Sequence, residues 1–168
     1  RIDFVLQALS LIKDEIPFVF YIVGDGEELD YLKLTTEILG LNNKVVFVGR
    51  VGREELSRIM FNSDIFVMMI INETLGLVYL EAMAQGCVPI GSKGEGIDGI
   101  IINEENGFLC DPFSVEDVAG SIKMIYSLPQ NMRERYILNA YHSVNNMTEK
   151  KMAEYYMSVL KRVANIND

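Results

Sequence analysis

The chain has 168 residues, which is enough for one domain with a sizeable hydrophobic core. Hydrophobic residues make up 49% of it, which excludes disorder as a description of the bulk of the chain. The net charge of −9 at pH 7 argues against a nucleic-acid partner, because no Lys/Arg cluster could neutralise phosphates along a strand.

Cys87 and Cys110 lie in apolar contexts and form no metal-like pair, so we interpret them as reduced core thiols of a cytosolic protein. The sequence shows no signal-peptide pattern, and its longest apolar run, Ile65 to Ile71, has the length of a buried strand. The chain starts at Arg1 without an initiating Met and enters a predicted helix almost at once. We therefore expect a fragment whose function is shared with a missing part.

Apolar periodicity and the positions of Gly and Pro predict an alternation of helices and strands. In the first half we expect a helix at 4–12, a buried strand at 18–23, a helix at 27–39, a strand at 45–48, a helix at 53–61 and a strand at 65–70. In the second half we expect a helix around Glu81 that ends at Gly86, extended pieces at 88–90, 100–102 and 107–110, and helices at 115–127, 132–144 and 149–165.

This alternation predicts a single α/β domain over residues 1–168, with a doubly wound, Rossmann-like parallel sheet. Ligands of such sheets bind beyond the carboxyl ends of the strands. Four segments follow predicted strands: Gly24-Asp25-Gly26, Gly49-Arg50, Glu73 to Leu77, and Gly91 to Gly99. We expect these segments to lie together and to form the binding site.

The segment from Glu73 to Glu81 is the most informative part of the chain. Apart from these two acids and Thr74 it is apolar, and Gly76 opens the predicted helix. The first N–H groups of a helix lack internal partners and attract an anion such as phosphate. One acid before that terminus and one two turns inside it could hold hydroxyl groups on either side of the phosphate, which suits a sugar nucleotide. An ordinary pair of surface glutamates is the alternative interpretation.

Gly24-Asp25-Gly26 is placed like a phosphate-binding loop, although a tight strand-to-helix turn explains it equally well. Leu29 stands where a dinucleotide fingerprint needs a third glycine, and Gly49-Arg50 stands where it needs an acid. Both differences argue against NAD or FAD. The sequence also has no Ser/His/Asp set, no metal-ligand cluster and no P-loop.

Taken in order, several segments resemble a known family. They are Val23-Gly24-Asp25-Gly26, Val46-Phe47-Val48-Gly49, Ser63 to Val67, Glu73 to Leu77, Glu81 to Ile90, and Asn106 to Leu109. Together they resemble the C-terminal, donor-binding domain of retaining glycosyltransferases with the GT-B fold, the large family related to sucrose synthase. The resemblance runs from residue 1 to about 160.

The resemblance implies a role for each matching position. Glu73 would contact the donor sugar and serve as the catalytic residue, with Thr74 beside it. The N–H groups of Gly76 and Leu77 would hold the distal phosphate. Glu81 would bind the ribose hydroxyls. The base would meet the backbone of Val48, Gly49 and Arg50, and Gly24 and Gly26 would line the same donor site.

The resemblance also implies what is absent. No metal or other cofactor is expected, since helix amides and basic side chains replace the metal in this fold. The family's first strand and its N-terminal acceptor domain are missing, so this fragment alone should be inactive. The helix at 149–165 would pack on the missing domain. Met69-Ile70 replace the family's usual Pro-Ser, and Glu95 interrupts its Gly-Gly loop.

We therefore expect the donor-binding half of an enzyme that moves a hexosyl group, with retention, from a UDP-, GDP- or ADP-sugar to a glycan or lipid acceptor. The family suggests envelope or capsule polysaccharide synthesis in the cytoplasm, with peripheral association at the inner face of the membrane. Two alternatives remain open at this point. One is a non-catalytic nucleotide-sugar-binding or regulatory module, and the other is a GT-B fold sugar-nucleotide epimerase.

Overall fold

The structure is a computed structural model that describes residues 1–72, 76–145 and 147. Helices and strands alternate along it, as the sequence predicts. The elements are α1 (Ile2–Ile12), β1 (Phe20–Val23), α2 (Leu29–Ile38), β2 (Val45–Gly49), α3 (Arg53–Phe61), β3 (Ile65–Val67), α4 (Leu77–Ala84), β4 (Val88–Ser92), β5 (Phe108–Cys110), α5 (Val115–Ser127) and α6 (Gln130–Asn145).

All strand pairs are parallel, which confirms the predicted α/β class. The strands form two hydrogen-bonded groups, β1-β2 and β3-β4-β5. Tyr21 lies opposite Val46 in the first group, and Phe66 lies opposite Pro89 in the second. The sequence predicts one sheet, whereas the described residues contain no ladder between β1 and β3.

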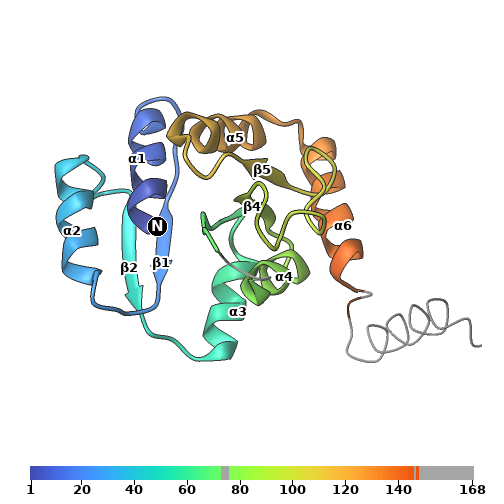
Figure 1. Cartoon of the computed structure of the whole chain (residues 1–168), viewed down its shortest axis with the longest axis horizontal. Coiled ribbons are helices and arrows are strands. Elements are labelled where there is room, and N and C mark those ends of the chain that lie inside the picture. The colour runs from blue at the N-terminus through green and yellow to red at the C-terminus, as the bar shows by residue number, and fades with distance from the viewer. Residues whose placement is uncertain (73–75, 146, 148–168) are drawn as a thin grey trace, which may run out of the picture.

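Both groups of strands share one hydrophobic core. Its buried side chains come from α1, from strands of each group and from α5, for example Leu6, Ile22, Ile90 and Ile122. The helices α1 and α5 pack against each other on one face, and α4 packs between α3 and α6 (Figure 1). Strands covered by helices on both faces explain the continuous apolar runs in the sequence.

The helices α3 and α5 have the bounds that the sequence predicts. Local chemistry explains the start of α5, where the Ser114 hydroxyl accepts a hydrogen bond from the Asp117 N–H at 3.1 Å. Glu116 and Asp117 place negative charge in the first turn, where the helix dipole favours it. Such local signals can be read directly from a sequence.

The strand predicted at 65–70 is too long, because β3 ends at Val67. Beyond it the backbone leaves the ladder: the Ile70 N–H donates to the Ser92 hydroxyl at 3.0 Å, and the Met68 carbonyl accepts from the Tyr79 hydroxyl. The extended piece predicted at 100–102 makes only an isolated bridge, between Asp98 and Ile101. The helix predicted at 149–165 lies outside the described residues.

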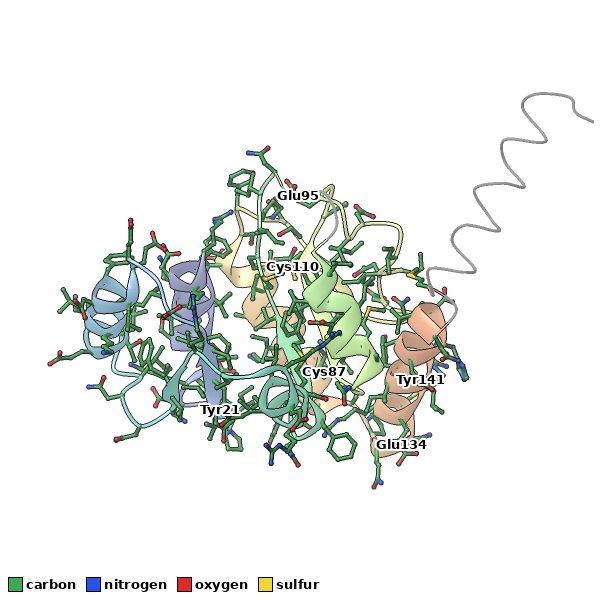
Figure 2. All side chains as sticks on the ribbon, turned by 90° about the horizontal axis from the view of Figure 1, so that it is seen from below. Tyr21, Cys87, Glu95, Cys110, Glu134 and Tyr141 are labelled. Carbon is green, nitrogen blue, oxygen red and sulfur yellow. The ribbon has the colours of Figure 1, made fainter. Side chains whose placement is uncertain are left out.

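Both cysteines are buried and free, in agreement with their interpretation as core thiols. Figure 2 shows them in the interior of the molecule. Burial, together with the negative charge of Asp64, raises the pKa of the Cys87 thiol to about 12. Burial likewise raises the pKa of Cys110 to about 11, although its contact with the Ser121 hydroxyl acts in the opposite direction. Both thiols therefore stay protonated at neutral pH.

These raised pKa values make a prediction about reactivity. The thiolate is the reactive form, so in the native protein at about pH 8 iodoacetamide should modify neither cysteine within an hour. In denaturant both should react within minutes, because their pKa values return to about 8.5. Mass spectrometry of the quenched reactions measures this. Rapid modification of the native protein would show that the thiols are not in the core.

Candidate functional site

The loops that follow β1 and β2 are joined to each other. The Gly24 N–H donates to the Gly49 carbonyl at 2.8 Å, and Arg50 Nε lies 3.3 Å from Asp25 Oδ1. Because β1 and β2 are parallel, both loops leave the same edge of the strands. The structure thus brings together Gly24, Gly49 and Arg50, as the sequence predicts, with Gly26 exposed in the first of these loops.

The start of α4 requires a glycine. Gly76 caps the helix with φ of 68°, a conformation that side chains disfavour, and a Cβ there would lie 2.9 Å from the ring of Tyr79. Gly76 itself has no side chain to cap this terminus. Leu77, the first residue of α4, is exposed, and a helix carries a partial positive charge at this end. Glu73 and Thr74 lie outside the described residues.

Tyr79 and Ser92 hold the chain that leaves β3. Tyr79 is fully buried, and its hydroxyl donates to the Met68 carbonyl. Ser92, at the end of β4, is also fully buried and accepts from the Ile70 N–H. These two side chains fix the segment that leads to Glu73, at the carboxyl ends of β3 and β4.

Glu81 faces the first turn of α3. Its Oε1 lies 3.7 Å from Nη2 of Arg53, the first residue of that helix. The Glu81 side chain is 46% exposed and that of Arg53 is 92% exposed, so water reaches the pair. Arg53 follows Arg50 by three residues. Glu81 is therefore directed towards the start of α3, which follows the segment that carries Val48 and Gly49.

The glycine-rich segment from Gly91 to Gly99 forms a compact turn. The Asp98 carboxylate accepts from the Gly94 N–H at 2.7 Å, and the buried Ile97 anchors the turn against Tyr79. A Cβ at Gly91 would lie 2.9 Å from Ile97, so close packing requires glycine at that position. The sequence predicts that this segment belongs to the binding site, and its packing also suits a connecting turn.

Sequence reasoning missed three residues that shape this site: Tyr79, Ser92 and Arg53. Arg53 carried a readable signal, because a cation in the first turn of a helix opposes the helix dipole and so needs another reason to be there. Tyr79 and Ser92 carried no such signal. Their partners lie 11 and 22 residues away, and only the fold brings them together.

The described residues contain neither a candidate metal-binding cluster nor a candidate membrane-spanning helix. No group of three or more His, Cys, Asp or Glu residues there could hold a metal ion. None of the helices in that part of the chain has the length and apolar character that crossing a membrane requires.

Known proteins identify the family. The sequence model of the glycosyl transferases group 1 family matches residues 1–143. The chain belongs to this family. A curated member, the N-acetyl-alpha-D-glucosaminyl L-malate synthase of Bacillus anthracis, is 30% identical over 96% of the chain. The chain spans 43% of the length of that relative, so it corresponds to part of a larger protein of the family.

Solved structures of glycosyltransferases have the same fold. The C-terminal domain of the group 1 protein LpcC from Francisella tularensis covers 87% of the chain with a TM-score of 0.73 and 25% identity, and the match spans 78% of that domain. HepE of Anabaena, solved with UDP and glucose, covers 92% of the chain with a TM-score of 0.78 and 24% identity. That match spans 44% of HepE. The predicted resemblance to a C-terminal GT-B domain is confirmed.

The role of Tyr79 in this family member can be tested by stability. Tyr79→Phe leaves the Met68 carbonyl without its buried donor and should lower the free energy of unfolding by about 1–3 kcal/mol. Urea denaturation measures the loss. The matched control is Tyr126→Phe. The Tyr126 side chain is exposed on α5, so loss of its hydroxyl should change the free energy of unfolding by less than about 0.5 kcal/mol. Equal effects would contradict the role of Tyr79.

Proposed function

We propose that the chain is the donor-binding half of a retaining glycosyltransferase. The complete enzyme would move a hexosyl group from a nucleotide-diphosphate sugar to a glycan or lipid acceptor. One observation carries the proposal beyond family membership. The pair Asp25–Arg50 links the loops that follow β1 and β2, and the pair Arg53–Glu81 links the start of α3 to α4.

The amino end of α4 is the proposed phosphate subsite. The N–H groups of Gly76 and Leu77 begin this helix, and the partial positive charge there favours an anion. Because Gly76 has no side chain, a diphosphate oxygen can approach the backbone closely. This arrangement neutralises part of the diphosphate charge without a metal ion, and a metal-independent reaction is therefore part of the proposal.

The nucleoside would lie over the two joined loops. Glu81, half exposed and directed towards α3, would accept hydrogen bonds from the two ribose hydroxyls. The backbone of Val48, Gly49 and Arg50 is the proposed contact for the base, and Gly24 and Gly26 would line the opposite side. The Arg53 pair with Glu81 is solvent-exposed and hence weak, so ribose hydroxyls can compete for the carboxylate at little cost.

Glu73 is the proposed catalytic residue, in contact with the donor sugar, with Thr74 as a neighbouring donor contact. The chemical step would depend mainly on stabilising the charge that develops on the leaving diphosphate, which fixed helix amides do without reorganisation. The leaving phosphate would help to deprotonate the acceptor on the same face of the sugar, which gives retention. UDP is the first nucleotide to test, since the similar HepE was solved with UDP and glucose.

The acceptor would bind to the part of the protein that this chain does not include. A glycan or lipid acceptor in envelope or capsule polysaccharide synthesis is the proposal, with the complete enzyme in the cytoplasm, at the inner face of the membrane. The chain on its own would bind donor but not transfer sugar.

Glu81→Gln in the full-length protein tests the donor site. Loss of a charged hydrogen-bond acceptor costs about 1.5–3 kcal/mol, so the Kd for the cognate nucleotide should rise by about 10- to 150-fold. Isothermal titration with UDP, GDP and ADP measures it.

Arg53→Gln is the matched control, because it breaks the same ion pair but keeps the Glu81 carboxylate. It should change the Kd by less than about fivefold, as expected for an exposed pair. Unchanged binding in Glu81→Gln, or equal weakening in both variants, would overturn the assignment of Glu81.

The reaction type can be tested by the product. The full-length enzyme with its donor and acceptor should yield a glycoside whose anomeric configuration equals that of the donor, and the proton NMR coupling of the anomeric position reports it. An inverted product would contradict retention. An epimerised nucleotide sugar would favour the epimerase alternative, and no turnover of any donor would favour a non-catalytic binding module.

A further inference from the structure

Asn72 has a backbone conformation that side chains seldom adopt. Its φ is 63°, in the left-handed region, where a Cβ atom crowds the carbonyl group that follows it. Asn adopts this conformation more readily than most residues other than Gly. Among the described residues, Glu104 is the only other non-Gly residue with a positive φ. Residues held in this region cluster at functional sites, so the place of Asn72 in the fold is informative.

The chain on the amino side of Asn72 is held by buried side chains. The Met68 carbonyl accepts a hydrogen bond from the Tyr79 hydroxyl, and the Ile70 N–H donates to the Ser92 hydroxyl at 3.0 Å. Asn72 itself is exposed, so packing does not explain why this side chain stands here. The backbone conformation is therefore the feature of Asn72 that needs an explanation.

The chain on the carboxyl side is fixed at Gly76, which begins α4 against the ring of Tyr79. A Cβ at Gly76 would lie 3.6 Å from Cδ1 of Ile70. Ile70 and Gly76 therefore lie next to each other, although residues 71–75 separate them in the sequence. A chain that returns so soon to its starting point must reverse its direction, and a left-handed residue such as Asn72 suits a reversal.

Asn72 directly precedes Glu73, the residue that we propose contacts the donor sugar. Rotation about a backbone bond redirects all of the chain that follows it, so the φ of Asn72 sets the direction in which the chain enters Glu73. The proposed nucleotide contacts are separate from this turn, because Gly76, Leu77 and Glu81 lie at the start of α4 or within it. A change at Asn72 should therefore affect the sugar and spare the nucleotide.

We propose that Asn72 is a positioning residue for the donor sugar. Its left-handed backbone directs the chain so that Glu73 meets the sugar, and Asn holds this conformation with fewer alternatives than Gly would. The inference rests on the proposed function, because it requires a sugar nucleotide at the amino end of α4. An ordinary surface turn is the alternative, and in that case the conformation of Asn72 has no effect on the sugar.

Glu104 provides a matched control. It is exposed, its φ is 62°, and its N–H donates to the Gly107 carbonyl at 2.9 Å. The strands β3 and β5 both run parallel to β4. Asn72 follows β3 whereas Glu104 precedes β5, so the two residues lie towards opposite ends of the strands. A side chain that disfavours the left-handed conformation should lower the stability at either position, but it should affect the candidate site only at Asn72.

The test compares Asn72→Val, Asn72→Gly and Glu104→Val in the full-length protein. Val disfavours the left-handed conformation, whereas Gly adopts it freely. The donor is the UDP-, GDP- or ADP-hexose that the wild-type protein consumes, beginning with UDP-glucose, and the binding probe is the matching free nucleotide. Asn72→Val should lower kcat for release or transfer of the hexose by about ten- to hundredfold, as displacement of a reacting group by about 1 Å does. Its Kd for the free nucleotide should change by less than about threefold.

The two other variants separate conformation from side chain and from stability. Asn72→Gly should keep at least about a third of kcat, because it retains the left-handed backbone without the amide group. Glu104→Val should keep kcat within about twofold, even where its Tm falls as far as that of Asn72→Val. If Asn72→Val does not fold, Asn72→Ala replaces it, because Ala disfavours the same conformation less strongly than a β-branched residue.

Three outcomes would overturn the proposal. They are an unchanged kcat in Asn72→Val, equal losses of kcat in Asn72→Val and Asn72→Gly, and a loss of nucleotide affinity in Asn72→Val as large as its loss of kcat. The second would assign the effect to the amide side chain, and the third would show that the turn and α4 are not independent. A wild-type protein that consumes no nucleotide sugar would contradict the proposed function itself, before any variant is compared.

Discussion

The hydrogen bond from the Tyr79 hydroxyl to the Met68 carbonyl is the contact on which the candidate site depends. It joins α4 to the chain that leaves β3, so the helix that offers its amino end and the segment that leads to Glu73 are positioned by one side chain. The Tyr79 ring in turn restricts what surrounds it. Its edge leaves no room for a Cβ at Gly76, and it packs against Ile97 and Ile101 under the neighbouring turn. A buried aromatic side chain with a satisfied hydroxyl thus sets the shape of a surface site.

The charges at the rim are arranged differently from this buried contact. Asp25–Arg50 and Arg53–Glu81 are exposed ion pairs, and such pairs contribute only about 0–1 kcal/mol to stability. Their value to a binding site lies in that weakness. Because they are weak, a ligand with hydroxyls and phosphates could replace either partner at small cost. The rigid part of the site lies below, in Tyr79 and Ser92, and the exchangeable part lies at the surface.

The sequence predicted those features that depend on local chemistry. The bounds of α3 and α5, the glycine at the start of α4 and the gathering of Gly24, Gly49 and Arg50 at one edge all follow from caps, periodicity and the geometry of parallel strands. It failed where distant residues compete for the backbone. Apolar residues continue from Ile65 to Ile71, so periodicity extends β3, but Tyr79 and Ser92 take the hydrogen bonds that would extend the ladder. A run of apolar residues predicts burial, and Met69 is indeed buried. Such a run does not predict the hydrogen-bond partners of its peptide groups.

The strands of the described residues are divided into two hydrogen-bonded groups, β1-β2 and β3-β4-β5. Hydrophobic burial alone does not require a continuous sheet, since α1 and α5 pack over both groups and complete one core. The loops that bind ligands in such folds sit at the carboxyl ends of the central strands. Gly24 and Met68 directly follow β1 and β3 and both line one cavity, so the candidate site borders both groups of strands.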